Sequence, residues 1–127
     1  MDDASQLARR ALALSRERKE RGYQARAFWL LGEIAAHRDP PEVEQAEDHY
    51  RQAIALAEEL GMRPLQAHCH QGLGALYTKT DRREQARAAL SSAIALYRAM
   101  EMTFWLPRAE AALAGVAGPG SLERGSG

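Results

Sequence analysis

The sequence predicts an all-α protein, a right-handed superhelical solenoid of about six helices arranged in antiparallel pairs. One reason is that apolar residues recur three and four positions apart along most of the chain, as they do on one face of a helix. The other is that this pattern returns 40 to 42 residues later, from Ala46 to Ala86 and from Phe28 to His70. Such repeated units cannot bury their apolar faces alone, so they are expected to stack on their neighbours.

The clearest unit lies at residues 67–97, which are predicted to form two antiparallel helices joined by a polar turn at residues 79–81. Gly74 stands inside the first of these helices, where glycine is less favourable than alanine by ~1 kcal/mol. A neighbouring helix that approaches closely at this glycine would offset that loss. The apolar stripes are Leu73, Gly74 and Tyr77 in the first helix, and Ala86, Leu90 and Ala93 in the second.

Taken in order, residues 4–19 are predicted to form a half unit, a second helix without its first, which Gly22 ends. A whole unit follows at residues 23–60, with a first helix at 23–37 and a second at 43–60. Pro40 and Pro41 define the turn between them, because proline removes a backbone donor and biases its predecessor away from the helical region. Gly61 is expected to cap the second helix. The alanines Ala4, Ala8 and Ala11 of the half unit match Ala46, Tyr50 and Ala53 of the whole unit.

A second whole unit is predicted at residues 64–101 and a final half unit, a first helix without its second, at residues 104–117. The apolar face of this last helix is Leu106, Ala109, Leu113 and Val116. Residues 118–127 are rich in glycine and serine, so they are expected to be a flexible linker or a cloning-derived tail. Residues 1–117 would then form a single repeat domain.

The composition is that of one ordinary domain, with 46% hydrophobic and 27% charged residues in 127. Because 17 basic and 17 acidic residues cancel, no overall field would attract nucleic acid or an anionic membrane. The single cysteine, Cys69, cannot form an internal disulfide, and neither a secretory signal nor a membrane-spanning run is present. We therefore expect a cytoplasmic protein that binds neither nucleic acid nor membrane.

The pattern Leu73-Gly74-x2-Tyr77, followed by Ala86-x3-Leu90-x2-Ala93, resembles the tetratricopeptide repeat, with His70 where that family prefers tryptophan. Residues 60–70 and 97–106 further resemble the C-terminal repeat tail of large bacterial regulatory proteins of the ATPase and adenylate-cyclase type. The resemblance covers residues 4–117 and implies a role in contacts between proteins. It would make this chain such a tail, carrying neither cyclase nor ATPase residues.

No pattern in the sequence predicts catalysis, a cofactor, a metal site or a small-molecule substrate. His68, Cys69 and His70 include good zinc ligands, but residues two apart on a helix diverge by about 200°. Gly72-x-Gly74 lies inside a predicted helix, without the strand–turn–helix setting of a phosphate-binding loop. No nucleophile stands beside a base, so the chain is predicted not to be an enzyme.

The predicted function is a non-catalytic protein–protein interaction module that binds a partner segment in a concave groove. The resemblance implies that the first helices of successive units line this groove, so that equivalent positions form stripes. The alternative is that these positions are only a solvated face. The predicted groove residues are Arg26, Trp29, Glu33, His68, Gln71 and Arg108.

Charge decides which segment such a groove would suit. Arg26, His68 and Arg108 are predicted to share one stripe beside Trp29, which favours an acidic segment with an apolar anchor. A histidine with its ordinary pKa of about 6.5 would add positive charge on mild acidification and tighten binding. The family's basic clamp for C-terminal carboxylates is not supported, because its Lys and Asn positions are held by Trp29, Glu33 and Gly72.

The alternative prediction is a self-assembling structural scaffold, natural or engineered as an oligomer component, that associates through its terminal helices. A solenoid normally finishes with a polar capping helix. Here the first predicted helix has no hairpin partner, and the last one carries small apolar residues toward water. The candidate assembly surface is Leu7, Phe104, Trp105, Ala111 and Ala112.

Overall fold

A computed structural model describes the backbone of residues 3–17 and 19–126, and the side chains of residues 4–17 and 19–116. The described backbone forms six helices and no strands, which confirms the all-α prediction. The helices are α1 (Asp3–Glu17), α2 (Arg21–Ala36), α3 (Val43–Leu60), α4 (Arg63–Lys79), α5 (Arg83–Ala99) and α6 (Trp105–Ser126). None of these described helices combines the length and the apolar character that crossing a lipid bilayer requires.

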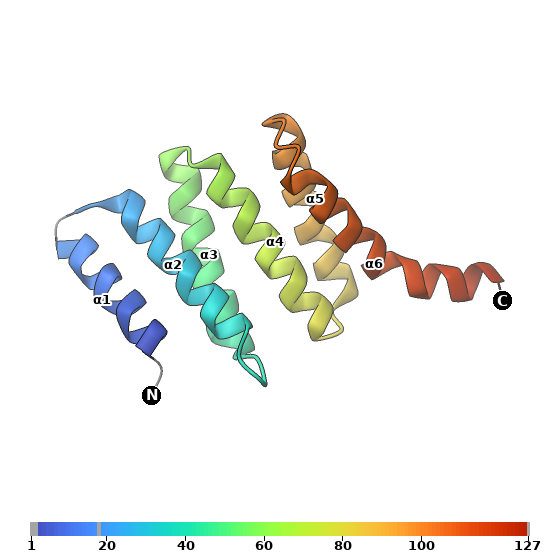
Figure 1. Ribbon diagram of the computed structural model, residues 1–127, viewed down its shortest axis with the longest axis horizontal. Helices are drawn as coiled ribbons and strands as arrows, with labels where there is room; N and C mark the ends of the chain where they lie inside the picture. Colours follow the sequence, from blue (N-terminus) through green and yellow to red (C-terminus); the bar gives the residue numbers. More distant parts are fainter. Residues whose placement is uncertain (1–2, 18, 127) are drawn as a thin grey trace.

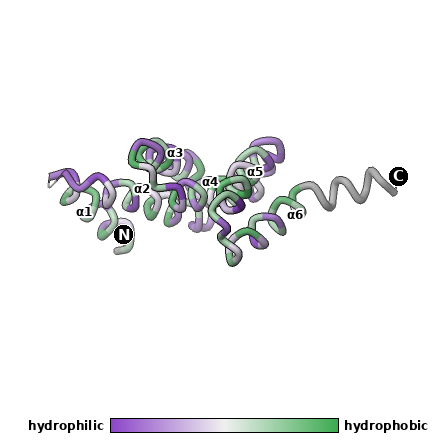
Figure 2. Tube along the Cα trace, turned by 90° about the horizontal axis from the view of Figure 1, so that it is seen from above, coloured by the Kyte–Doolittle hydropathy of each residue, from purple (hydrophilic) through white to green (hydrophobic). Residues whose placement is uncertain are grey.

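The helices form two layers (Figures 1 and 2). Each helix packs on the next one along the chain, and α2 also contacts α4, as α4 contacts α6. In the part of the chain that the structure describes, α3 and α5 make no backbone contact with each other. The helices α2, α4 and α6 therefore make one continuous layer that α3 and α5 support from the other side. This is the predicted solenoid of stacked helix pairs.

Four of the connections between helices share one backbone motif. Each has one residue in the left-handed region. The N–H of the next residue along the chain donates a hydrogen bond to the carbonyl four positions before the left-handed residue, as in a Schellman C-cap. The left-handed residues are Lys19, Gly61, Asp81 and Glu101. The closing hydrogen bonds are Glu20 to Ser15, Met62 to Ala57, Arg82 to Tyr77 and Met102 to Tyr97. The predicted cap at Gly61 is confirmed, whereas the other three use residues with side chains.

Two predicted boundaries differ from the structure. Gly22 does not break the first helix, because the chain reverses at Lys19 and Gly22 already lies in the first turn of α2. The helix predicted to end near Ala117 continues to Ser126, so the backbone at residues 118–126 is helical. Glycines and Pro119 suggested a linker there, but the stretch between Gly120 and Gly125 has residues compatible with a helix.

The core lies between the two layers and follows the predicted stripes. Tyr50 and Tyr97, both at 0% exposure, are its largest fully buried side chains. On α1 only part of the predicted stripe is covered, because α2 is the only one of the described helices that α1 contacts. Ala8 is buried, while Ala4 and Ala11 are exposed.

Candidate binding groove

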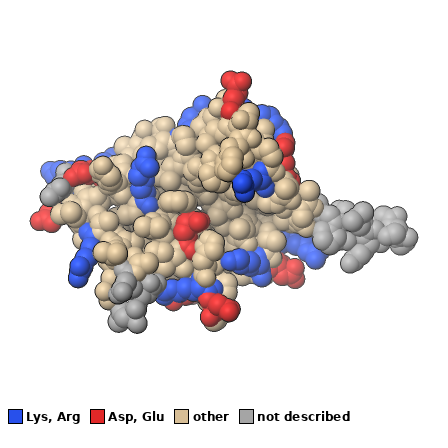
Figure 3. All heavy atoms as spheres, in the orientation of Figure 1, with Lys and Arg blue, Asp and Glu red and all other residues tan. Residues whose placement is uncertain are grey.

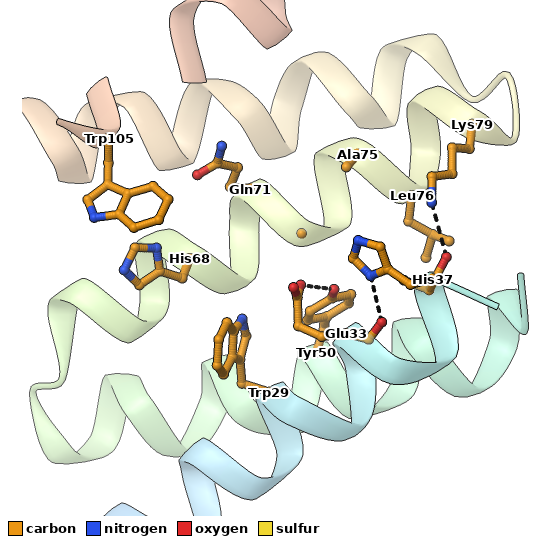
Figure 4. Close-up of a pocket in the computed structure, with 12 residues that line it drawn as sticks. Trp29, Glu33, His37, Tyr50, His68, Gln71, Ala75, Leu76, Lys79 and Trp105 are labelled. Atoms are coloured by element: carbon orange, nitrogen blue, oxygen red, sulfur yellow. Dashed lines mark hydrogen bonds between the residues drawn. The ribbon is translucent and has the colours of Figure 1, made fainter. Parts of the chain in front are cut away.

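A cleft of about 270 Å³ opens on the layer of α2, α4 and α6 (Figure 4). We call this cleft the groove. Four of the six predicted groove residues line it, two from α2 and two from α4: Trp29, Glu33, His68 and Gln71. His37, Lys79 and Trp105 also line it, although the repeat spacing did not predict them there. Side chains from three successive first helices thus meet on one surface.

The floor of the groove is fixed from below by Tyr50 of α3. Its ring lies between Gly32 of α2 and Gly72 of α4, where an added Cβ would come within 2.9 Å and 2.6 Å of ring atoms. Only glycine leaves room for the tyrosine to pass between the two helices. The Tyr50 hydroxyl then donates a hydrogen bond to the Glu33 carboxylate. Burial, and secondly this carboxylate, raise the pKa of Tyr50, so it remains a donor.

A second buried tyrosine fixes the other side of the floor. The Tyr97 hydroxyl donates to Oε1 of Gln71 at 2.8 Å and lies 2.7 Å from Nδ1 of His68. A hydroxyl has one proton, so this arrangement assigns a proton to Nδ1 of His68, which donates it to Tyr97. In the neutral ring, Nε2 is then left as an acceptor.

An aromatic row runs from α2 to α6 along this layer. The ring centroids of Trp29 and His68 lie 6.4 Å apart, and those of His68 and Trp105 lie 4.7 Å apart in an edge-to-face arrangement. Phe104 continues the row at 5.0 Å from Trp105, and the Arg108 guanidinium covers Phe104 at 4.4 Å. Such edge-to-face and cation–π contacts hold large side chains in place at a surface.

The remaining predicted groove residues lie beside the groove. Arg26 lines a neighbouring cleft together with Trp29 and His68. Arg108 lies against Phe104, and the residue of α6 that contacts His68 is Trp105. Trp105 stands three residues before Arg108, hence on the same face one turn earlier, and its indole is long enough to reach back to α4.

The expected effect of mild acidification needs correction. The prediction assumed that His68 titrates near its ordinary pKa, but burial lowers the pKa of this histidine. His68 therefore stays neutral where an exposed histidine would begin to gain charge. The Glu33 carboxylate acts in the opposite direction on the pKa of His68, but its influence is smaller than that of burial. Tighter binding of an acidic segment through a third positive charge is no longer expected on mild acidification.

The side chains of the His68–Cys69–His70 run point to different parts of the molecule. His68 lines the groove, whereas His70 lines a cleft between α3 and α5. Cys69 is fully buried between them, and burial raises the pKa of its thiol to about 12. Across the described residues, no group of three or more His, Cys, Asp or Glu side chains is arranged to hold a metal ion.

The candidate assembly residues fall into two places. Leu7 on α1 is 64% exposed, and Phe104, just before α6, is 60% exposed. Ala111 and Ala112 are also exposed on α6. Trp105, by contrast, is half-buried within the aromatic row and lines the groove.

Sequence reasoning missed the role of the buried tyrosines. It assigned Tyr50 to the apolar stripe of a second helix, which its 0% exposure confirms. The overlooked signal is chemical, because a tyrosine on a buried stripe must still find a partner for its hydroxyl. On a second helix packed under two first helices, that partner lies on the opposite layer. Both Tyr50 and Tyr97 satisfy their hydroxyls in this way.

A comparison with known protein families finds the profile of the tetratricopeptide repeat over residues 42–99. The match runs from the residue before α3 to the end of α5, and the six-helix solenoid is consistent with it. Tetratricopeptide repeats generally mediate contacts between proteins and not catalysis. A comparison with curated proteins found no match.

Proposed function

We propose that the chain is a non-catalytic tetratricopeptide repeat module that binds a segment of a partner protein in the groove. The observation that carries the proposal is the fixed polarity of the groove floor. Buried tyrosines orient Glu33, Gln71 and His68, whose remaining donor and acceptor atoms can meet a peptide backbone or side chain. Such preorganised groups lose little freedom on binding, which favours affinity.

The charge balance of the chain favours a protein over nucleic acid or a membrane as the partner. The chain has no net charge, which gives nucleic acid and anionic membranes no general attraction. A single, buried cysteine is compatible with the reducing cytoplasm. The resemblance of residues 60–70 and 97–106 to repeat tails of bacterial ATPase and cyclase regulators would make the partner a component of such a regulatory protein or its target.

The groove can be obstructed without touching the core. Ala75 is exposed and lines the groove from α4, so the Ala75→Arg variant places a long side chain across it. We expect segments selected on the unmodified chain from a display library of random twelve-residue peptides to bind this variant about tenfold more weakly or worse. Fluorescence anisotropy with the labelled peptides measures the change.

The matched control is Ala95→Arg, the same substitution at an exposed alanine of α5 that lines neither the groove nor any of the neighbouring clefts. This variant is expected to bind like the unmodified chain. Equal affinity of the Ala75→Arg variant and the unmodified chain, or a selection that yields no binding peptide, would count against groove binding.

The second candidate is a structural scaffold that assembles through its terminal helices, and we propose it on the exposure of Leu7 and Phe104. Large apolar side chains that are exposed by 64% and 60% would be covered in an oligomer. Light scattering is then expected to give a mass above the 14.0 kDa monomer at micromolar concentration. Changing Leu7 and Ala112 to glutamate should restore the monomer, because association would bury unpaired charge.

Both substituted residues are exposed, so the fold should survive the change. A monomeric mass at every concentration would remove the scaffold and leave the interaction module.

A further inference from the structure

Two apolar clefts flank α2 beside the groove, and Arg26 and Leu30 line both of them. The first cleft, of about 510 Å³, lies between α2 and α4 and is lined by Leu30, Pro64 and Leu65. The second, of about 420 Å³, lies between α1 and α2 and is lined by Leu14, Tyr23 and Leu30. The face of α2 that carries Arg26 and Leu30 is therefore a ridge between two apolar hollows.

The apolar side chains of this surface are unusually open to water. Tyr23 is 65% exposed, Leu14 47% and Leu30 43%, and all three line the cleft between α1 and α2. Figure 3, which views the molecule from the side of α2, α4 and α6, shows large areas of this face that carry neither acidic nor basic side chains. A surface of this kind indicates an interaction site more than a solvated face.

Arg26 is an exposed guanidinium without a partner on this ridge. Among the described residues, no hydrogen bond or ion pair joins it to another side chain, whereas Arg21 pairs with Glu59 and Arg38 with Glu42. Glu20, the acidic residue that also lines the cleft between α1 and α2, is engaged in an interaction of its own. A peptide that covers both clefts would displace part of the water around Arg26, which is unfavourable unless the peptide brings a carboxylate.

We propose that the partner segment carries two apolar side chains, one for each cleft, and an aspartate or glutamate between them that pairs with Arg26. This inference rests on the proposed function and extends it, because the cleft between α2 and α4 shares Trp29 and His68 with the groove, so a segment bound in the groove can also reach Arg26. Packed helices lie roughly 8–10 Å apart. An extended chain advances roughly 3.3 Å per residue, so the two anchors stand two or three residues apart. Because the carboxylate belongs to a side chain, the segment needs no free C-terminus.

The test is a charge swap read out in the selected sequences. Twelve-residue random peptides, displayed with both ends blocked by flanking sequence, are selected in parallel on the unmodified chain and on the Arg26→Glu variant. The unmodified chain should enrich two apolar residues two or three positions apart with an acidic residue between them. The Arg26→Glu variant should keep the apolar pair and enrich lysine or arginine between them.

The second measurement is the affinity of soluble peptides with an acetylated N-terminus and an amidated C-terminus, in which the peptide and Arg26 are changed separately and together. Replacing the peptide's acidic residue by its amide should weaken binding to the unmodified chain about two- to fivefold, as for an exposed ion pair. The same replacement should have no effect on the Arg26→Met variant, which keeps the aliphatic stem. The control Arg87→Glu reverses an exposed arginine of α5 outside these clefts and should leave the enriched pattern unchanged.

The outcomes separate this inference from the groove itself. An identical enriched pattern on the unmodified chain and on Arg26→Glu overturns the role of Arg26, even if Ala75→Arg abolishes binding and so supports the groove. Peptides that respond to Arg26→Glu but not to Ala75→Arg support the charge pairing while contradicting groove binding as proposed. A selection that enriches no peptide on the unmodified chain overturns both.

Discussion

Replacing Gly74 by leucine is expected to lower the free energy of unfolding by about 1–3 kcal/mol. A Cβ at this position would lie 2.5 Å from both Cγ and Cδ2 of Leu90. Leu90 is 1% exposed and belongs to the core, so it has no free space into which to move. The added side chain must therefore push α4 and α5 apart. Urea denaturation followed by far-UV circular dichroism measures the loss.

Two comparisons make the Gly74 result specific. Gly115 lies in α6 with nothing within 4 Å of an added Cβ, so Gly115→Ala should raise stability by up to ~1 kcal/mol through helix propensity alone. Combining Gly74→Leu with Leu90→Ala should cost less than the two changes separately, because the alanine vacates the space that the leucine needs. Unchanged stability in Gly74→Leu, or strict additivity with Leu90→Ala, would contradict the helix packing described above.

Removal of the Tyr50 side chain is expected to have a larger effect than Gly74→Leu. Tyr50→Ala deletes a ring at 0% exposure that fills the space between Gly32 and Gly72, and such deletions typically cost ~3–5 kcal/mol. Tyr50→Phe keeps the ring and removes only the hydrogen bond to the Glu33 carboxylate, which is expected to cost ~1.5–3 kcal/mol. Denaturant titration of the three proteins in parallel separates packing from hydrogen bonding.

The phenylalanine variant also tests how the groove floor is held. Without the hydroxyl, the Glu33 carboxylate loses the donor that orients it, so peptides selected on the unmodified chain should bind this variant more weakly although its fold is retained. Equal stability of Tyr50→Ala and Tyr50→Phe would show that the ring is not the main contributor. A Tyr50→Phe variant with unchanged peptide affinity would remove Glu33 from the binding surface.

The sequence was sufficient for the repeated part of the fold, for a physical reason. Each whole unit contains both of its helices, so the stripe of one helix could be checked against the stripe of the other. The bounds of α3 and the cap at Gly61 agree with the structure on this basis. The close approach predicted at Gly74 is also confirmed, because the missing side chain leaves room for Leu90 of the facing helix.

Features that depend on a single residue or on one end of the chain were harder to predict. The turn at Lys19 uses a left-handed residue with a side chain, which composition does not signal, so the break was placed at Gly22 instead. The position of Trp105 depends on how far an indole reaches across a helix interface, and repeat spacing carries no such information. The pKa of His68 depends on burial by Trp105 and its neighbours, which is set by tertiary packing.

The linear order of helix contacts has a consequence for motion. Among the described helices, α1 contacts only α2, whereas α4 contacts α2, α3, α5 and α6. In an array held by nearest-neighbour contacts, local unfolding begins where the fewest contacts must be lost. Amide hydrogens of α1 should therefore exchange with solvent early and those of α4 late. The central helix of the groove, α4, is thus expected to open last, whereas Leu7 lies on the helix that is expected to open first.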